Sequence, residues 1–271
     1  MTFNDIMAAQ SASTALGAQE VRLLERVRRS GRAVIRVRRD RELFAGFDAD
    51  TRRHVLKRLA DSGWLARIER GVYGVAEAPG LQTDTQLAIL ADWLDGERYV
   101  VSGFFALAHW NLTNFPPSTV DILIERRRPD VRLGSTLFRF IYVPADRLPE
   151  YKEVRIGGAR ALARVATAER ALADALVGRH ATPIETALEA FRRGLRLGIL
   201  QRRRLSKAAR EAPSASARRL GWIAEHEHDQ LAPFLLTLVG NQGYVPLEPK
   251  RDATNAKRNT TWRVLENVDL A

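Results

Sequence analysis

The stretch ADTRRHVLKRLADSGWLARIERGVYGV, from Ala49 to Val75, decides the fold of the N-terminal part of this chain. Its first half has the apolar spacing of a helix that ends at Ser62-Gly63. Its second half predicts two strands, Leu65–Glu69 and Val72–Val75, joined by a tight Arg-Gly turn. Glycine suits such a turn because it adopts a positive φ at no steric cost. A helix followed by a hairpin is the second half of a winged helix-turn-helix.

The residues before this stretch predict the remaining elements of the same fold. They are a helix at Ala18–Ser30, a strand at Ala33–Val37 and a short helix at Asp40–Phe47. The carboxylate of Asp48 or Asp50 can cap the helix that follows, because it accepts the unpaired N–H groups of the first turn. Ala78-Pro79-Gly80 is a strong chain break. We therefore predict a winged helix-turn-helix domain over residues 1–80.

The charges of this domain predict its ligand. On a helical wheel, Val55, Leu56 and Leu59 gather on one side of the helix, and most of the basic residues lie on or near the opposite side. A basic helix beside a basic hairpin tip fits a DNA major groove and its flanking phosphates. The alternative is an ordinary solvated helix face. The predicted DNA-binding residues are Thr51, Arg52, Arg53, His54, Lys57, Arg58, Arg67 and Arg70.

Two of these residues have special positions on the wheel. Arg52 falls with the apolar side chains, so we expect its aliphatic stem to pack at the flank of the helix. Thr51 lies in the first turn, where its hydroxyl and the free backbone N–H groups could meet a phosphate.

Residues 81–271 predict a larger mixed α/β domain, so the fold class of the whole chain is α+β. The predicted helices are Asp84–Asp95, Gly103–Trp110, Thr167–Val177, Pro183–Gly194, Leu200–Glu211 and Ser216–Leu238, the last with an interruption at Pro233. The predicted strands are Tyr99–Val101, Thr119–Glu125, Phe138–Val143, Val154–Ile156, Ala163–Val165 and Thr260–Val268.

The composition narrows the class of partner. The net charge of +11 and the pI of about 10.7 favour polyanionic partners. The chain has no cysteine, which excludes disulfides, cysteine-ligated zinc fingers, iron–sulfur clusters and cysteine nucleophiles. We see no secretory signal pattern and no apolar run of about 18 residues, so we expect a cytoplasmic protein without a membrane span.

A few residues could carry chemistry instead. Asp121 and Glu125 share one face of a predicted strand and could hold a divalent ion, as in a metal nuclease, although carboxylates next to arginines more often form ion pairs. His226 and His228 are two residues apart on a predicted helix and point in different directions. We find no Walker loop or catalytic triad pattern. We therefore expect no cofactor, no metal and no enzymatic activity.

Three segments, in order, resemble the AbiEi family of antitoxins, the transcriptional regulators of type IV abortive-infection toxin–antitoxin pairs. They are LKRLADSGWLARIERGVYGV (Leu56–Val75), YVVSGFFALAHWNLT (Tyr99–Thr113) and VATAERALADAL (Val165–Leu176). The resemblance covers roughly residues 20 to 200. It departs from the family pattern at Ala168, where a proline is expected, and at Asn111, where a glycine is common.

The resemblance implies a role for each domain. The N-terminal domain would bind repeats in the promoter of its own operon and repress it. The C-terminal domain would counter a nucleotidyltransferase-like toxin, without requiring a stable complex. Glu169, Arg170 and Asp174 belong to a motif of the resemblance and are candidates to face the partner, although the i,i+4 spacing of the last two also suits an internal ion pair. The alternatives are a DNA-acting enzyme and a ligand-gated regulator without a toxin partner.

Overall fold

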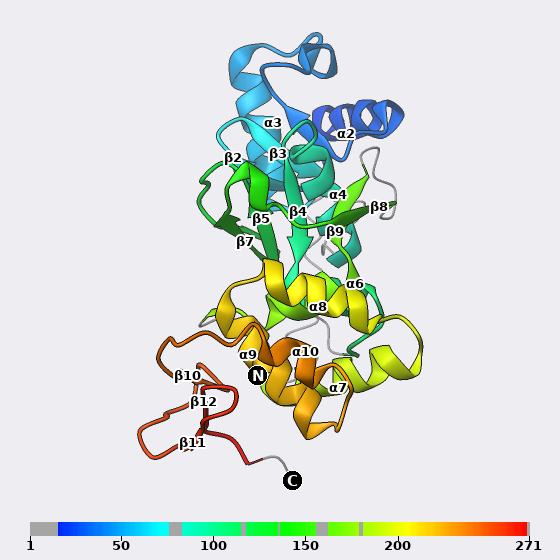
Figure 1. Ribbon diagram of the computed structural model, residues 1–271. Coiled ribbons are helices and arrows are strands. Elements are labelled where there is room, and N and C mark those ends of the chain that lie inside the picture. Colours follow the sequence, from blue (N-terminus) through cyan, green and yellow to red (C-terminus); the bar gives the residue numbers. More distant parts are fainter. Residues whose placement is uncertain are drawn as a thin grey trace, which may run out of the picture. The chain divides into compact units, whose positions relative to one another are not determined.

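The computed structural model describes residues 16–75, 83–114, 118–134, 136–155, 162–178 and 181–269 (Figure 1). Helices and three separate sheets make the chain an α+β protein, as the sequence predicts. The chain forms two compact units. The first contains residues 1–96, 131–136 and 155–163, and the second contains residues 97–130, 137–154 and 164–271. The predicted chain break at Ala78-Pro79-Gly80 lies outside the described residues.

The first unit combines helices with a small antiparallel sheet. Its helices are α2 (Ala18–Ser30), the 3-10 helix η1 (Arg41–Phe44), α3 (Ala49–Asp61) and α4 (Thr83–Trp93). Its strands are β1 (Val34–Arg36), β2 (Leu65–Glu69), β3 (Val72–Val75) and β6 (Val131–Leu133). The strand order of the sheet is β1-β3-β2. The predicted short helix at Asp40–Phe47 is a single 3-10 turn, since only Arg41–Phe44 is helical.

The helix ends of the first unit follow their local sequence. Gly31 ends α2 with a φ of +62°, a conformation that costs glycine little. Asp48 is the cap of α3, and its Oδ1 accepts the Thr51 N–H at 2.7 Å. Of the two candidate caps that the sequence offers, Asp48 and Asp50, the structure therefore uses Asp48.

One apolar core joins α2, α3 and the sheet. Leu23 and Val27 of α2 pack with Ile35 of β1, Leu59 of α3 and Leu65 of β2, and all five side chains are buried. The apolar face that the spacing in α3 predicts is therefore the face that packs inward, which leaves the basic face of α3 outside.

Helix α4 closes the other side of the sheet in this unit. A Cβ atom at Gly74 would lie 2.6 Å from Cγ2 of Ile89, so glycine is required where β3 passes under α4. The Arg36 guanidinium donates to the carbonyls of Asp92 and Trp93 at 3.0 and 2.9 Å. The compact unit therefore extends beyond residue 80.

The second unit has a mixed sheet with helices. Its strands are β4 (Tyr99–Ser102), β5 (Thr119–Ile124), β7 (Thr136–Tyr142), β8 (Tyr151–Val154), β9 (Ala163–Ala166), β10 (Val245–Pro246), β11 (Lys257–Asn259) and β12 (Val264–Glu266). Its helices are α5 (Gly103–His109), the 3-10 helix η2 (Ala145–Arg147), α6 (Ala168–Ala175), α7 (Ile184–Arg196), α8 (Arg202–Glu211), α9 (Ser214–His226) and α10 (Ala232–Leu236).

Strand pairing in this unit is both parallel and antiparallel. Strand β4 pairs antiparallel with β5 and parallel with β9, and β5 pairs parallel with β7. The last three strands form a small separate sheet in the order β10-β12-β11. Phe138 of β7, Phe191 of α7 and Trp262 are among the largest fully buried side chains.

Three sequence predictions in this unit differ from the structure. The strand predicted at Val154–Ile156 is β8 at Tyr151–Val154, and Ile156 lies outside the described residues. The single helix predicted at Ser216–Leu238 is two helices, and the interruption lies at 227–231, before Pro233. Pro233 is instead in the first turn of α10, where its missing N–H costs nothing. The strand predicted at Thr260–Val268 is shortened to Val264–Glu266 by a turn that contains Arg263, whose φ is +51°.

Candidate nucleic-acid interface

A groove of about 880 Å³ runs between α3 and the β2–β3 hairpin. Five of the eight predicted DNA-binding residues line it: Arg52, Arg53, Lys57, Arg67 and Arg70. The helix and the hairpin, which are consecutive in sequence, therefore place their cations on one concave surface of the first unit.

The cations on α3 differ in how they are held. The Arg53 side chain is 75% exposed and makes an ion pair with Asp50 at 3.1 Å. The Arg52 guanidinium lies over the Phe44 ring at 5.8 Å, which matches the packed stem expected at the flank of the helix. Lys57 is exposed and makes no ion pair among the residues that the structure describes.

The hairpin presents its two arginines to solvent. Arg67 and Arg70 are exposed, and within the described ranges neither makes an ion pair. Strand pairing shifts register between Arg67 and Glu69, which is a bulge that bends the strand. Gly71 turns the chain back with a φ of +77°, as the predicted tight turn requires.

Three predicted residues do not line the groove. The Thr51 N–H and hydroxyl both donate to Asp48, at 2.7 and 3.1 Å, so the cap already occupies them. Arg58 makes an ion pair at 3.2 Å with Glu20 of α2, whose side chain is only 5% exposed. His54 is exposed elsewhere on α3.

The structure adds one cation that sequence reasoning missed. Arg132 and Gly134 line the same groove, because β6 lies beside β2 in the first unit. No local signal could find Arg132, since it is far from α3 in sequence and reaches the groove only through the tertiary fold.

Positively charged side chains outnumber carboxylates in the lining of this groove. Six basic side chains and a single carboxylate, that of Asp61, line it. A concave surface with charge of one sign concentrates counterions of the other sign. Its chemistry is therefore suited to phosphate groups.

The segment Val165–Leu176, which contains α6, belongs to the second unit. The Arg170 Nε donates to Asp174 Oδ1 at 2.9 Å, and the Ser102 hydroxyl donates to Asp174 Oδ2 at 2.7 Å. Glu169 accepts the Gln201 N–H at 3.1 Å. Glu169 and Arg170 are buried, at 3% and 7% exposed. Glu169, Arg170 and Asp174, the candidates for facing a partner, thus make contacts within the unit. The i,i+4 spacing of Arg170 and Asp174 suits this internal ion pair.

Burial is the largest influence on the pKa of Asp174 in this cluster. It raises the pKa of the Asp174 carboxyl, while the charge of Arg170 and the hydrogen bonds from Ser102 and Arg170 act in the opposite direction. The cluster therefore depends on Arg170 to keep a buried carboxylate compensated.

The residues considered for metal chemistry are engaged with arginines. Asp121 pairs with Arg139 at 2.6 Å and Glu125 pairs with Arg98 at 2.9 Å. Among the described residues no group of three or more histidines and carboxylates could hold a metal ion. His226 stacks on the Trp222 ring at 5.2 Å.

Comparison with known proteins supports the fold alone. No protein-family model matches the chain, and no curated protein matches it. The fold is similar to the crystal structure of the RV2827C protein from Mycobacterium tuberculosis, with a TM-score of 0.61 and 13% sequence identity over 92% of each chain. No helix in the described parts of the chain combines the length and apolar character needed to cross a bilayer.

Proposed function

We propose that the first unit is a winged helix-turn-helix that binds duplex DNA. The supporting observation is the groove in which Arg53 and Lys57 of α3 meet Arg67 and Arg70 of the hairpin. In this assignment α2, η1 and α3 are the three helices, α3 is the recognition helix, and β2–β3 is the wing.

In this proposal some of the exposed cations determine sequence specificity and others determine the affinity for DNA. In this proposal Arg53 and Lys57, on the outer face of α3, read base edges, where a good bidentate contact contributes about 1–3 kcal/mol of discrimination. Arg67, Arg70 and Arg132 contact phosphates, which set affinity and its salt dependence but carry no sequence information. Arg58 holds α3 to α2 through Glu20 and acts on stability.

The proposed biological role is that of a transcriptional repressor which is also the antitoxin of a type IV pair. It rests on the resemblance of Leu56–Val75, Tyr99–Thr113 and Val165–Leu176 to AbiEi antitoxins. The protein would bind repeats upstream of its own operon, and its partner toxin would resemble a nucleotidyltransferase. We propose no cofactor for this role.

The DNA-binding proposal is tested by a mobility-shift titration of the full chain on its own upstream DNA, with a scrambled duplex as competitor. The full chain is used because α4, which covers β3, lies outside residues 1–80. We expect Arg53→Ala to weaken binding to the upstream DNA more than to the scrambled duplex. Arg22→Ala, an exposed arginine on α2 outside the groove, is the matched control and should bind like the parent.

The outcomes separate the parts of the proposal. If Arg53→Ala and Lys57→Ala both shift the upstream DNA as well as the parent does, α3 is not the recognition helix. The antitoxin role is tested by co-expression with a nucleotidyltransferase-like protein from the neighbouring reading frame. Growth arrest that this chain does not relieve would contradict that role and leave the DNA-binding proposal standing.

A further inference from the structure

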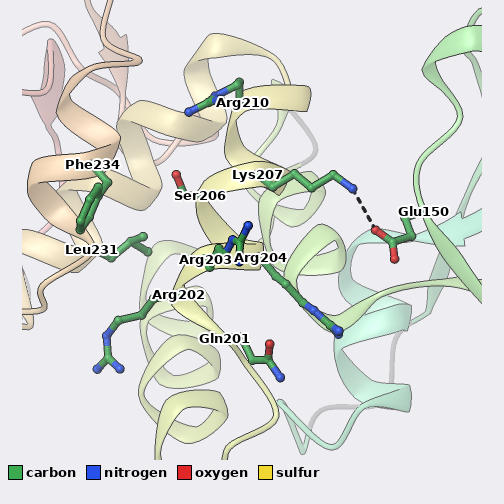
Figure 2. A pocket seen from close by; sticks show the side chains of 10 residues that line it. All are labelled: Glu150, Gln201, Arg202, Arg203, Arg204, Ser206, Lys207, Arg210, Leu231 and Phe234. Atoms are coloured by element: carbon green, nitrogen blue, oxygen red, sulfur yellow. Dashed lines mark hydrogen bonds and ion pairs between the residues drawn. The ribbon is translucent and has the colours of Figure 1, made fainter.

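A second basic groove, of about 860 Å³, lies over α8 in the second unit. Its cations come from consecutive turns of one helix: Arg202, Arg203, Arg204, Lys207 and Arg210. Leu231 and Phe234, from the segment around α10, line one side and Glu150 lines the other (Figure 2).

Two of these cations are neutralised within the unit. Arg202 donates to both carboxylate oxygens of Asp229, from Nε to Oδ1 at 3.0 Å and from a terminal nitrogen to Oδ2 at 2.7 Å. Lys207 pairs with Glu150 at 3.3 Å, the dashed contact in Figure 2. Both cations are thereby tied to carboxylates that belong to the fold.

The other three cations are available to a ligand. Arg203, Arg204 and Arg210 are exposed, and none makes an ion pair within the described part of the chain. Arg203 and Arg210 are seven residues apart, two helical turns or about 10 Å along α8, so they can contact different anionic groups of one extended ligand.

An exposed aromatic ring completes the groove. The Phe234 side chain is 64% exposed, the highest fraction among the exposed large apolar residues of the chain's described part. Leu231, which lines the same side of the groove and is drawn near Phe234 in Figure 2, is buried at 1% exposed. An exposed phenyl ring that lines the same groove as arginines offers a stacking surface to a planar group that carries a negative charge.

We propose that this groove binds a short single-stranded segment of nucleic acid, with one base stacked on Phe234 and phosphates at Arg203 and Arg210. In a duplex the base faces are buried in the base stack, so no base is available to stack on Phe234. The groove volume lies within the range of about 300–1,000 Å³ that is typical of ligand sites, so the segment is a few nucleotides long. This inference does not rest on the DNA-binding function of the first unit.

The test uses the full chain in a background that disables the first groove, Lys57→Gln with Arg67→Gln and Arg70→Gln. The probe is a labelled oligothymidylate of about ten nucleotides, within the site sizes of single-strand binders. An abasic strand, a poly-glutamate peptide and a duplex of the same length are the comparison probes. Binding is followed by fluorescence anisotropy at several salt concentrations.

Three variants separate stacking from charge. Phe234→Ala should weaken oligothymidylate binding about 10-fold, as expected for the loss of one stacked base, and leave the abasic strand unaffected. Phe234→Trp should restore binding. The double variant Arg203→Gln with Arg210→Gln should weaken binding of both the oligothymidylate and the abasic strand. It should also make the slope of log K against log salt less steep by about 1.4, at about 0.7 per phosphate.

Matched controls lie outside the groove. Leu236→Ala removes an exposed apolar side chain of α10, and Arg196→Gln removes an exposed arginine of α7; both should bind like the background. Equal binding of the abasic strand and no effect of Phe234→Ala would mean a polyanion site only and overturn the proposal. Tighter binding of poly-glutamate would assign the groove to an acidic protein, and no binding of any probe would remove the site.

Discussion

The salt dependence of DNA binding measures how many phosphates the first groove neutralises. Consider the triple variant Lys57→Gln, Arg67→Gln and Arg70→Gln. These three side chains line the groove, are exposed, and make no ion pair among the described residues. Their replacement therefore removes positive charge without leaving a buried carboxylate unpaired, so the fold should tolerate it.

The expected magnitude follows from counterion release. Each phosphate neutralised on duplex DNA contributes about −0.9 to the slope of log K against log salt, so loss of three contacts makes the slope about 2.7 less negative. Between 50 and 200 mM salt, the parent should therefore lose about 40-fold more affinity than the variant does. Loss of one contact would change the slope by only about 0.9.

The assay is fluorescence anisotropy on a labelled duplex from the upstream region, repeated at several salt concentrations. The control is Arg22→Gln, Arg28→Gln and Arg29→Gln on α2, which removes the same charge from exposed positions outside the groove. Thermal unfolding of each variant shows that it is folded. If the groove variant keeps the parent slope, or if the α2 variant changes the slope as much, phosphate binding in this groove is refuted.

Three further predictions concern stability and are measured by urea unfolding. Gly74→Ala should lower the free energy of unfolding by about 1–3 kcal/mol, because its Cβ would press on the buried Ile89; an unchanged midpoint would show that α4 does not pack there. Arg170→Leu should cost about 3–5 kcal/mol, because it leaves Asp174 buried without its cation, and adding Asp174→Leu should recover part of that loss. The Thr51 backbone N–H lowers the pKa of the Asp48 carboxyl, so the contribution of the cap is present at neutral pH and disappears as the pH falls through the lowered pKa. The difference between the parent and Asp48→Ala should therefore shrink in acid, and a difference that persists would contradict the cap.

Much of the first unit could be predicted from local sequence. The spacing of Val55, Leu56 and Leu59 identifies the buried face of α3, and Gly31 and Gly71 mark a helix end and a turn, because each signal depends on near neighbours in the chain. The predicted bounds of α2, β2 and β3 agree with the structure for this reason. The 3-10 turn in place of a helix shows the limit, since a short segment takes its conformation from what packs on it.

The second unit shows what local patterns leave undecided. The motif with Glu169 and Arg170 could face a partner or the interior, and only the packing of neighbouring helices buries it. The basic face of α8 looks like any solvated helix face in sequence. In the structure this face becomes one side of a groove, because Phe234 of α10 lines the same groove. The helix break that allows this arrangement lies before Pro233.

The sequence by itself determined the kinds of elements, the order of helix and hairpin, and the positive charge of the outer face of α3. It could do so because periodicity, capping and turn chemistry act between residues that are close along the chain. Only the tertiary structure decided that Arg132 joins the first groove, that Arg58 is held by Glu20, and that Phe234 lies beside α8. Those arrangements join residues far apart in sequence, and the packing of buried apolar side chains, which no local pattern specifies, brings them together.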